Sequence, residues 1–430
     1  MREMKDSGIS WVGEIPLQWN VYRNKDGFIN TKTIVGKNSK NTPLLSLTTK
    51  GIKLKDIDNP EGKQPESFDT YQCVEINDLV MCLFDLDISA VFSGLSSYNG
   101  MISPAYKVLK CNERVIAKYA DYWFRYIFDG RKFNQYAKNI RYTLTYDLFS
   151  ALPMLYPSVE EQQNIADYLD TKCTQIDTII AREQSVIEKL QEYKQSIITE
   201  TITKGLDSTI NMKYSGFKWL GNIPINCNIH SLKKVLLTPI TDGPHETPTL
   251  YDEGIPFVSA ESVKGGIINL DYKRGYISLK DHERFQKKVS PRKGDIFIVK
   301  SGATTGNIGI VTTDQVFDIW SPLALVRGDS SIVEQDFLYY QLLSNIFRVQ
   351  VEQGWSYGTQ QNIGMKALGN IKVLIPPLES QKNIVKYLDN KCSNMDTVIL
   401  KKQALIDKLA EYKKSLIYEV VTGKKEVPHV

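Results

Sequence analysis

The sequence predicts an α+β protein with two mixed helix-and-strand domains, separated by two long helical regions that pair as an antiparallel coiled coil with pseudo-two-fold symmetry. Two observations indicate this class. A stretch from Pro157 to Lys194 returns without a gap from Pro376 to Lys413, and many positions are identical. The segments before the two copies share only scattered landmarks. A long duplication means that one polypeptide contains two similar units, so its target should also have two parts.

The repeat also sets the expected domain boundaries. They divide the chain into a first domain (1–157), a first helical spacer (158–206), a second domain (207–376), a second helical spacer (377–424) and a tail (425–430). The first helical copy carries more acidic than basic residues, and the second copy the reverse. Helices of opposite charge are suited to pairing with each other, although solvated surface charge is the simpler explanation.

The bulk composition is ordinary for a globular protein. Of 430 residues, 42% are hydrophobic and 24% are charged, and the net charge of +4 does not by itself indicate nucleic acid. No apolar run is long enough to cross a bilayer and the first residues are polar, which favours a cytoplasmic protein outside membranes. The six cysteines form no CxxC pair, so we expect free buried thiols and no metal site.

Each domain opens with the same landmarks and keeps the same order of elements. Trp11-Val-Gly-Glu-Ile-Pro16 recurs as Trp219-Leu-Gly-Asn-Ile-Pro224. A strand predicted over 78–83 corresponds to one over 295–299, and aromatic helices over 119–128 and 337–347 follow. The residues between these landmarks differ almost completely, so the domains are two variable versions of one mixed architecture.

Each helical copy is predicted to form a short helix followed by a long one. In the first copy, Ser158-Val-Glu-Glu161 is a capping box, the long helix begins near Thr171, and Gly205 and Gly423 stand where the two long helices should end. Apolar residues recur at alternating spacings of three and four, which is typical of a coiled-coil seam. The predicted seam contains Ile176, Ile179, Val186, Leu190 and Tyr193, and Met395, Val398, Leu405, Leu409 and Tyr412. A wider stripe adds Ile180, Ile187, Ile399 and Ile406.

Antiparallel helices of this length would hold the two domains at opposite ends of a rod. A helix of about 33 residues spans roughly 50 Å, and one turn of B-DNA about 34 to 36 Å. The rod could therefore place two reading heads about one helical turn apart. A cytoskeletal or scaffold protein is the alternative from another class, but it explains only the helices and not the two different heads.

The sequence shows no catalytic motif. It contains no H-E-x-x-H, G-x-x-x-x-G-K-[ST] or G-x-S-x-G pattern and only four histidines. The turn Ser301-Gly-Ala-Thr-Thr-Gly306 lacks the lysine of a phosphate-binding loop, which favours a polar turn or a surface for nucleic-acid backbone. Glu61-Gly62-Lys63 resembles a nuclease fragment, and it leaves a stand-alone nuclease as an alternative. We expect no catalytic residue in this chain.

Several loops combine residue types that suit DNA contact. Lysine and arginine neutralise phosphates, whereas amide, hydroxyl and aromatic groups read base edges or stack on bases. Ordinary solvated loops are the alternative explanation for each segment. The candidate residues are Lys37, Asn38, Lys40, Asn139, Arg141, Tyr142, His245, Thr247, Lys287, Lys288, Ser301, Thr304, Thr305, Tyr357, Gln360, Gln361 and Asn362.

The motifs together resemble the specificity subunit of type I restriction-modification systems over essentially the whole chain. The two tryptophan-to-proline openers are similar to those of the family, as are the proline entries followed by Glu-x-Gln. Further similarities are Tyr168-Leu-Asp170, Tyr387-Leu-Asp389, Asp242-Gly-Pro-His245, Ser301-Gly-Ala-Thr-Thr-Gly306 and Gln361-Asn362-Ile363. The first domain departs from the second, because it has no S-G-A-T-T-G turn and carries Leu83-Phe-Asp85-Leu-Asp87 in the corresponding region.

The resemblance implies a non-catalytic DNA-recognition subunit. Each domain would be a target-recognition domain that reads half of an interrupted, asymmetric site in double-stranded DNA, and the helices would form a spacer and a docking surface for two modification subunits. Those partners would use S-adenosylmethionine, and restriction subunits in the full complex would use ATP and Mg²⁺, with no cofactor in this chain. A specificity subunit of a fused or simplified restriction-modification enzyme remains a related alternative.

Overall fold

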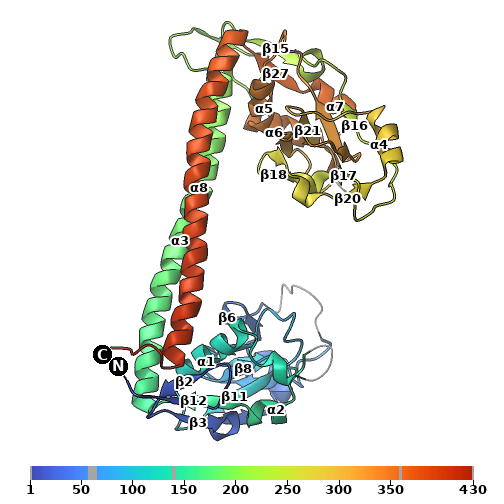
Figure 1. The fold of residues 1–430 in the computed structure, drawn as a ribbon. Coiled ribbons are helices and arrows are strands. Elements are labelled where there is room, and N and C mark those ends of the chain that lie inside the picture. The colour runs from blue at the N-terminus through green and yellow to red at the C-terminus, as the bar shows by residue number, and fades with distance from the viewer. Residues whose placement is uncertain (1, 57–64, 138–141, 358–360, 429–430) are drawn as a thin grey trace. The chain divides into compact units, whose positions relative to one another are not determined.

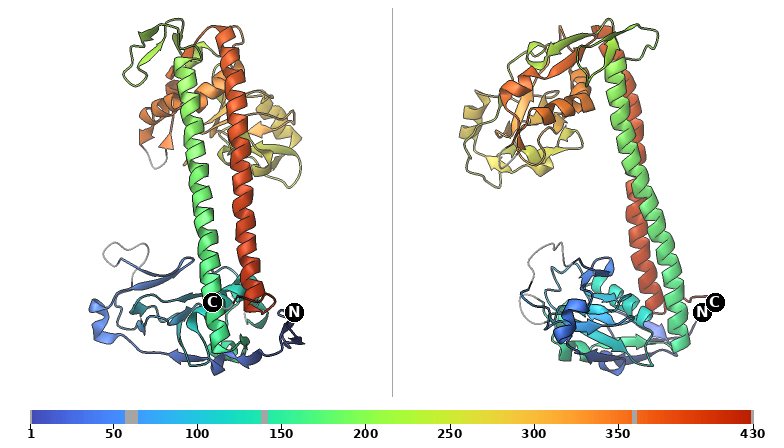
Figure 2. Two further views of the ribbon diagram at one scale, coloured as in Figure 1. Left: turned by 90° about the vertical axis from the view of Figure 1, so that its left-hand side faces the viewer. Right: turned by 180° about the vertical axis from the view of Figure 1, so that it is seen from behind.

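The computed structural model describes residues 2–56, 65–137, 142–357 and 361–428. The chain forms two compact units, one of residues 1–184 with 404–430 and one of residues 185–403. Both long helices, α3 (Val159–Lys204) and α8 (Leu378–Val421), contribute a part to each unit. Within each unit the two helix segments lie side by side and run in opposite directions (Figures 1 and 2). The predicted class, with two mixed domains and an antiparallel helix pair, is confirmed.

The domain of the first unit is built on a four-stranded antiparallel sheet with the order β4-β11-β8-β9. Aromatic side chains of α1 pack on this sheet, and the rings of Phe28 and Phe124 lie 5.5 Å apart in the core. The elements are β1 (Met4–Asp6), β2 (Glu14–Pro16), β3 (Asn20–Arg23), β4 (Phe28–Thr31), β5 (Leu45–Thr48), β6 (Gly51–Leu54), β7 (Gln72–Val74), β8 (Leu79–Met81), β9 (Ser93–Leu95), β10 (Gly100–Ile102), β11 (Lys107–Cys111), α1 (Ala117–Asp129), α2 (Tyr146–Ala151) and β12 (Pro153–Tyr156).

The domain of the second unit is built on a six-stranded mixed sheet with the order β16-β24-β21-β22-β19-β18, beside a three-stranded sheet β20-β17-β23. Strand β21 is buried along its whole length, as expected for a central strand. The elements are β13 (Met212–Tyr214), β14 (Asn222–Pro224), β15 (Asn228–Ser231), β16 (Thr241–Asp242), β17 (Ile255–Val258), β18 (Val263–Lys264), β19 (Ile267–Ile268), β20 (Gly275–Ile277), α4 (Leu279–Gln286), β21 (Ile296–Val299), β22 (Ile308–Ile310), β23 (Asp318–Ile319), β24 (Leu323–Val326), α5 (Gln335–Leu343), α6 (Asn345–Gln353), β25 (Ser356–Tyr357), β26 (Gln361–Asn362), α7 (Met365–Asn370) and β27 (Lys372–Ile375).

The same contacts attach each domain to its following helix. In the first unit, the buried side chain of Gln162 accepts from the backbone of Ile116 at 2.8 Å and donates to the carbonyls of Arg114 and Pro157. In the second unit, Gln381 accepts from the backbone of Glu334 at 2.8 Å. It donates to the carbonyls of Ile332 and Pro376. The glutamine of each Glu-x-Gln motif therefore fixes its helix to backbone groups of the preceding domain.

Two details of the predicted helices are wrong. Helix α3 is continuous from Val159, so the expected break near Thr171 does not occur. The Thr171 hydroxyl donates to the Asp167 carbonyl one turn earlier, which lets threonine continue a helix instead of capping one. The helix expected over 337–347 is instead two helices, α5 and α6, interrupted at Ser344, whose backbone is extended. The predicted helix ends are confirmed, because Gly205 and Gly423 have φ of 72° and 73°.

The capping box at the start of α3 is half formed. The backbone N–H of Glu161 donates to the Ser158 hydroxyl at 3.2 Å, as expected. The Glu161 carboxylate does not complete the box, because it accepts from the Trp19 indole at 2.9 Å and pairs with Arg2 at 2.6 Å. The Glu161 side chain therefore makes tertiary contacts in place of the hydrogen bond to the Ser158 backbone that the capping-box motif predicts.

The predicted seam is wrong by one residue at several positions. The inward positions of α3 are 173, 176, 180, 183, 187, 190, 194 and 197, and this series keeps the alternation of three and four without interruption. Ile176, Leu190, Met395 and Leu409 lie in the seam and Val186 is half-buried. The exposed fractions are 44% for Ile179, 58% for Tyr193, 42% for Val398, 42% for Leu405 and 52% for Tyr412.

A lysine in the seam explains the shift. In the second unit, Lys194 pairs with Asp396 across the two helix segments at 2.7 Å. In the first unit, the equivalent Lys413 pairs with Asp177 at 2.6 Å. Because lysine is not apolar, the hydrophobic pattern predicts the neighbouring tyrosines, Tyr193 and Tyr412, as seam residues. The predicted seam is therefore displaced toward the exposed face of each helix. Ile180, Ile187, Ile399 and Ile406, predicted only to widen the stripe, are seam residues.

No helix in the described part of the chain has the length and hydrophobicity required to span a bilayer. All six cysteines are free, but Cys73 and Cys111 are only half-buried, so the expectation of buried thiols is wrong for these two.

Candidate nucleic-acid interface

A buried aspartate organises the candidate surface of the second unit. Asp242, in β16, pairs with Lys288 at 2.7 Å, with Lys300 at 2.9 Å and with His245 at 3.1 Å. Burial alone would raise the pKa of Asp242, but hydrogen bonds and positive charge from the two lysines together lower it below the ordinary value of 3.8. The turn after Asp242 needs Gly243, because a Cβ there would collide with the carbonyl of Ile319. Asp242 therefore stays ionised and holds the two lysine ammonium groups and the His245 imidazole together.

The S-G-A-T-T-G turn lies beside this cluster and is tied to the Gln361–Asn362 segment. The backbone of Gly302 donates to the Gln361 carbonyl at 3.0 Å, and the backbone of Ile363 donates to the Lys300 carbonyl at 2.9 Å. Thr305 is buried, and its hydroxyl lies within hydrogen-bonding distance of the carbonyls of Gly302 and Gln361, so it holds the turn from inside. Thr304 and the two amide side chains, Gln361 and Asn362, are exposed.

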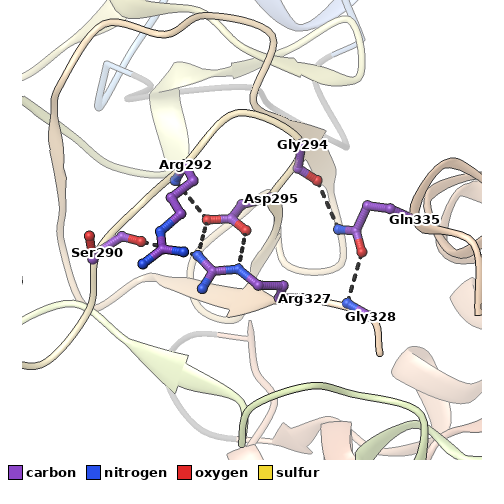
Figure 3. A network of polar contacts seen from close by, with 7 residues as sticks. All are labelled: Ser290, Arg292, Gly294, Asp295, Arg327, Gly328 and Gln335. Carbon is purple, nitrogen blue, oxygen red and sulfur yellow. Dashed lines mark hydrogen bonds and ion pairs between the residues drawn. The ribbon is translucent and has the colours of Figure 1, made fainter. Parts of the chain in front are cut away.

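The basic segment from Arg284 to Lys293 is fixed to the sheet by an ion pair that no sequence motif indicates. Arg327, after β24, donates two hydrogen bonds to Asp295, before β21, at 2.7 and 2.6 Å, and a third to the Ser290 carbonyl (Figure 3). The Arg292 backbone also donates to Asp295, which is buried. A bidentate pair of this kind is directional, so the segment that carries Lys287 and Lys288 has a defined position.

The structure thus brings together candidates that are far apart in the sequence. His245, Lys288, Ser301, Gln361 and Asn362 belong to one network of turns, and Lys287 follows directly from the end of α4. Thr247 lies exposed on the turn that begins at Gly243. Cationic groups beside exposed amides and hydroxyls have the chemistry for phosphate neutralisation and for reading base edges.

The candidates of the first unit are arranged differently. Lys37, Asn38 and Lys40 are exposed on a short 3₁₀ turn, which the buried Ser39 anchors through a hydrogen bond to Asp69 at 2.6 Å. Tyr142 is also exposed and has a φ of 44°. Among the described residues no hydrogen bond joins Tyr142 to the 3₁₀ turn. The two units therefore offer unlike surfaces.

The region from Leu83 to Asp87 forms an ordered turn in the first unit. The Arg131 guanidinium donates to the carbonyls of Leu86 and Ser89, and the backbone of Ser89 donates to the Asp85 carbonyl at 2.7 Å. Asp85 adopts a φ of 51°. The other candidates, Asn139, Arg141 and Gln360, and the fragment Glu61-Gly62-Lys63, lie outside the described residues, as does the side chain of Tyr357.

A second candidate surface follows from the shifted seam. The first unit exposes Ile179, Leu405 and Tyr412 on its helix segments, and the equivalent residues of the second unit are Val398, Val186 and Tyr193. Exposed charged positions are repeated as well, because Lys172, Lys189 and Glu192 correspond to Lys391, Lys408 and Glu411. Packing within the chain does not account for identity at exposed positions. Each unit therefore carries similar apolar and charged groups along its helix segments.

The fold and these surfaces define a protein with two unlike recognition domains on one repeated helical frame. Comparison with known proteins shows which family of proteins the chain resembles. Residues 245–407 match the family model of the type I restriction modification DNA specificity domain. The resemblance to type I specificity subunits, expected from the sequence, is therefore confirmed.

Individual relatives agree with this placement. The chain is 25% identical over 250 residues to the specificity subunit of the type I restriction enzyme EcoBI of Escherichia coli, a match that covers 56% of this chain but only 52% of that protein. It is 23% identical over 437 residues to a protein named as the MjaX specificity subunit of a type I restriction enzyme in Methanocaldococcus jannaschii, covering 97% of this chain and 96% of that protein.

A solved structure shares the fold. It concerns the complex assembly and conformational transition of a type I restriction-modification system, and one of its chains aligns with a TM-score of 0.69 and 16% identity. The alignment covers 96% of this chain and 99% of that chain.

Proposed function

We propose that this chain is the sequence-specific DNA-binding subunit of a type I restriction-modification complex. Its two domains would read the two halves of an asymmetric, interrupted site in double-stranded DNA, and partner subunits would methylate and cleave. The observation that carries this proposal is the combination of one repeated frame with two unlike polar surfaces. Identical surfaces would favour a palindromic site, whereas the S-G-A-T-T-G turn in one unit and the 3₁₀ turn in the other have different chemistry.

The surface of the second unit supports DNA reading most directly. Lys287, Lys288 and Lys300 supply positive charge, and ion pairs hold two of them in place before DNA arrives. Gln361 and Asn362 carry the amide groups that make paired hydrogen bonds to adenine in the major groove. Phosphate contacts from the lysines would set the position of the domain, and the amides would read bases.

The repeated helix surface supports two identical partners. The trio Ile179, Leu405 and Tyr412 in one unit has the same character as Val398, Val186 and Tyr193 in the other. Large exposed apolar groups on a helix, rimmed by repeated charges, are typical of a protein interface. We assign this surface to two copies of the modification subunit, which would bring S-adenosylmethionine, while restriction subunits would bring ATP and Mg²⁺.

Single-molecule methylome sequencing tests the function. Cells that carry this chain with its neighbouring modification and restriction genes should show a split, asymmetric methylated motif, and the motif should vanish when only this chain is deleted. Complementation with the intact chain should restore it. A palindromic motif, or methylation that does not change on deletion, would contradict the proposal.

A further inference from the structure

A cavity of about 410 Å³ opens in the second unit where helix α3 ends, away from the residues assigned to DNA. Its walls come from the last turn of α3, the turn between β14 and β15, and the first turns of α8. Apolar groups of Ile202, Pro224, Cys227 and Ile384 line it, and Ser380 and Asn383 border it. The cavity is partly open to solvent, so a group from outside can enter it.

The equivalent place in the first unit is filled by a tryptophan. Trp19 occupies the position of Cys227, since the backbone of Trp19 donates to Pro16 at 3.0 Å and that of Cys227 donates to Pro224 at 2.9 Å. The indole is 1% exposed, and its N–H donates to Glu161, the residue equivalent to Ser380. In the second unit, cysteine and serine replace tryptophan and glutamate, which leaves the space open.

The space around the glycines that end the two helices shows how differently the two units are packed. At Gly423, beside Trp19, an added Cβ would collide with Pro16 and lie 3.0 Å from the indole. At Gly205, in the second unit, the nearest heavy atom to an added Cβ is Pro224 at 3.9 Å. The helix end is therefore closely packed in the first unit. In the second unit the equivalent place has an unfilled space of roughly the size of one large side chain.

We propose that the cavity in the second unit is a docking site for an aromatic side chain of the indole type, presented by a partner polypeptide. The first unit shows the chemistry that fits, because there the chain fills the same walls with its own indole. The surroundings favour a polypeptide over a small free molecule, since Leu206 of the cavity wall is exposed, and so are Met212 and Ile225, which pair with and follow Pro224 of the wall. An aromatic anchor in a pocket with an apolar surround is a common source of binding energy between proteins.

Fluorine NMR of the full chain with 5-fluoroindole as the probe tests the cavity. We expect one site in the wild type, and a loss of affinity of at least about tenfold in Cys227→Trp, because an internal indole would exclude the probe. Cys227→Ser is the matched control and should keep the site, and Leu206→Glu, at an exposed rim position, should weaken binding without affecting folding. Trp19→Ala should gain a second site. Absence of binding to the wild type, or binding that Cys227→Trp leaves unchanged, would overturn the assignment.

Competition then tests the occupant. Purified partner subunits are added one at a time to the chain saturated with 5-fluoroindole, and release of the probe by one of them identifies the source of the aromatic group. Cys227→Trp should weaken assembly with that subunit and leave the methylated DNA motif unchanged, so this result is separable from the test of DNA recognition. Retention of the probe in the fully assembled complex would refute docking by a partner.

Discussion

At the scale of single residues, one buried glutamine attaches each domain to the helix that follows it, Gln162 in the first unit and Gln381 in the second. Gln162 and Gln381 are fully buried, and each satisfies its amide group through three hydrogen bonds to backbone groups. A buried amide left without partners costs about 1 to 3 kcal/mol for each lost group, so these side chains cannot be removed without consequence.

Gln162→Ala should lower the free energy of unfolding by about 3 kcal/mol, because it leaves one N–H and two carbonyls of the domain boundary without their partners. Chemical denaturation of the purified chain measures this difference. Gln163→Ala is the control, since Gln163 is exposed and its amide donates to Asp167 of the same helix. Equal stability of the two variants would show that the buried amide does not hold the junction.

Asp242 should make the free energy of unfolding depend on pH in the acid range. Its pKa is lowered in the folded protein, so its stabilising contribution is present above the ordinary value of 3.8 and is lost as the pH falls through the lower, folded value. Asp242→Asn should therefore destabilise the chain near neutral pH and have a diminishing effect below pH 3.8. Unfolding curves of both proteins across this range test the prediction, and a constant difference would contradict it.

At the scale of elements, the helix pair separates positions that hold the fold from positions that face outward. Leu190 and Leu409 lie in the seam, whereas Tyr193 and Tyr412, three residues further along each helix, are exposed. The two sets have similar hydrophobicity, so hydrophobicity alone does not distinguish them. Their opposite placement allows stability and partner binding to be tested separately.

Leu190→Asp combined with Leu409→Asp should break the helix pair, because a charge placed in a seam loses solvation, at a cost of about 3 kcal/mol or more for each site. Tyr193→Asp combined with Tyr412→Asp should leave the melting temperature nearly unchanged and weaken binding of the modification subunit. Circular dichroism and size-exclusion chromatography with that subunit distinguish the two outcomes. Assembly unaffected by the leucine pair would refute the role of the seam.

The existence and the ends of the two long helices were the most predictable part of this fold. The positions that form the seam between them were the least predictable part. Ser158 and Gly205 mark the start and the end of α3 through local backbone chemistry that the sequence displays directly. The register depends on Lys194, whose ion pair with Asp396 is a tertiary contact. The cluster around Asp242 was likewise unpredictable, because it joins three segments that only the folded sheet brings together.

At the scale of the whole molecule, the two units share a frame and differ in the surfaces they present. We expect that Gln361→Ala combined with Asn362→Ala will relax or change one half of the methylated motif and leave the other half intact. Lys37→Ala combined with Lys40→Ala should not alter that same half, and it serves as the reciprocal variant. Methylome sequencing measures both, and a simultaneous change in both halves would contradict independent reading.

The glutamine junctions have a consequence for how such a molecule can change over generations. The hydrogen bonds of Gln162 and Gln381 run to main-chain carbonyls, which every residue has, and to a main-chain N–H, which every residue except proline has. Substitutions at the bonded domain positions therefore need no matching substitution of either glutamine. These backbone hydrogen bonds place little requirement on the side chains of the domain, so this part of the junction accommodates two unlike domains, whereas the side-chain contact between Trp19 and Glu161 is specific to the first unit.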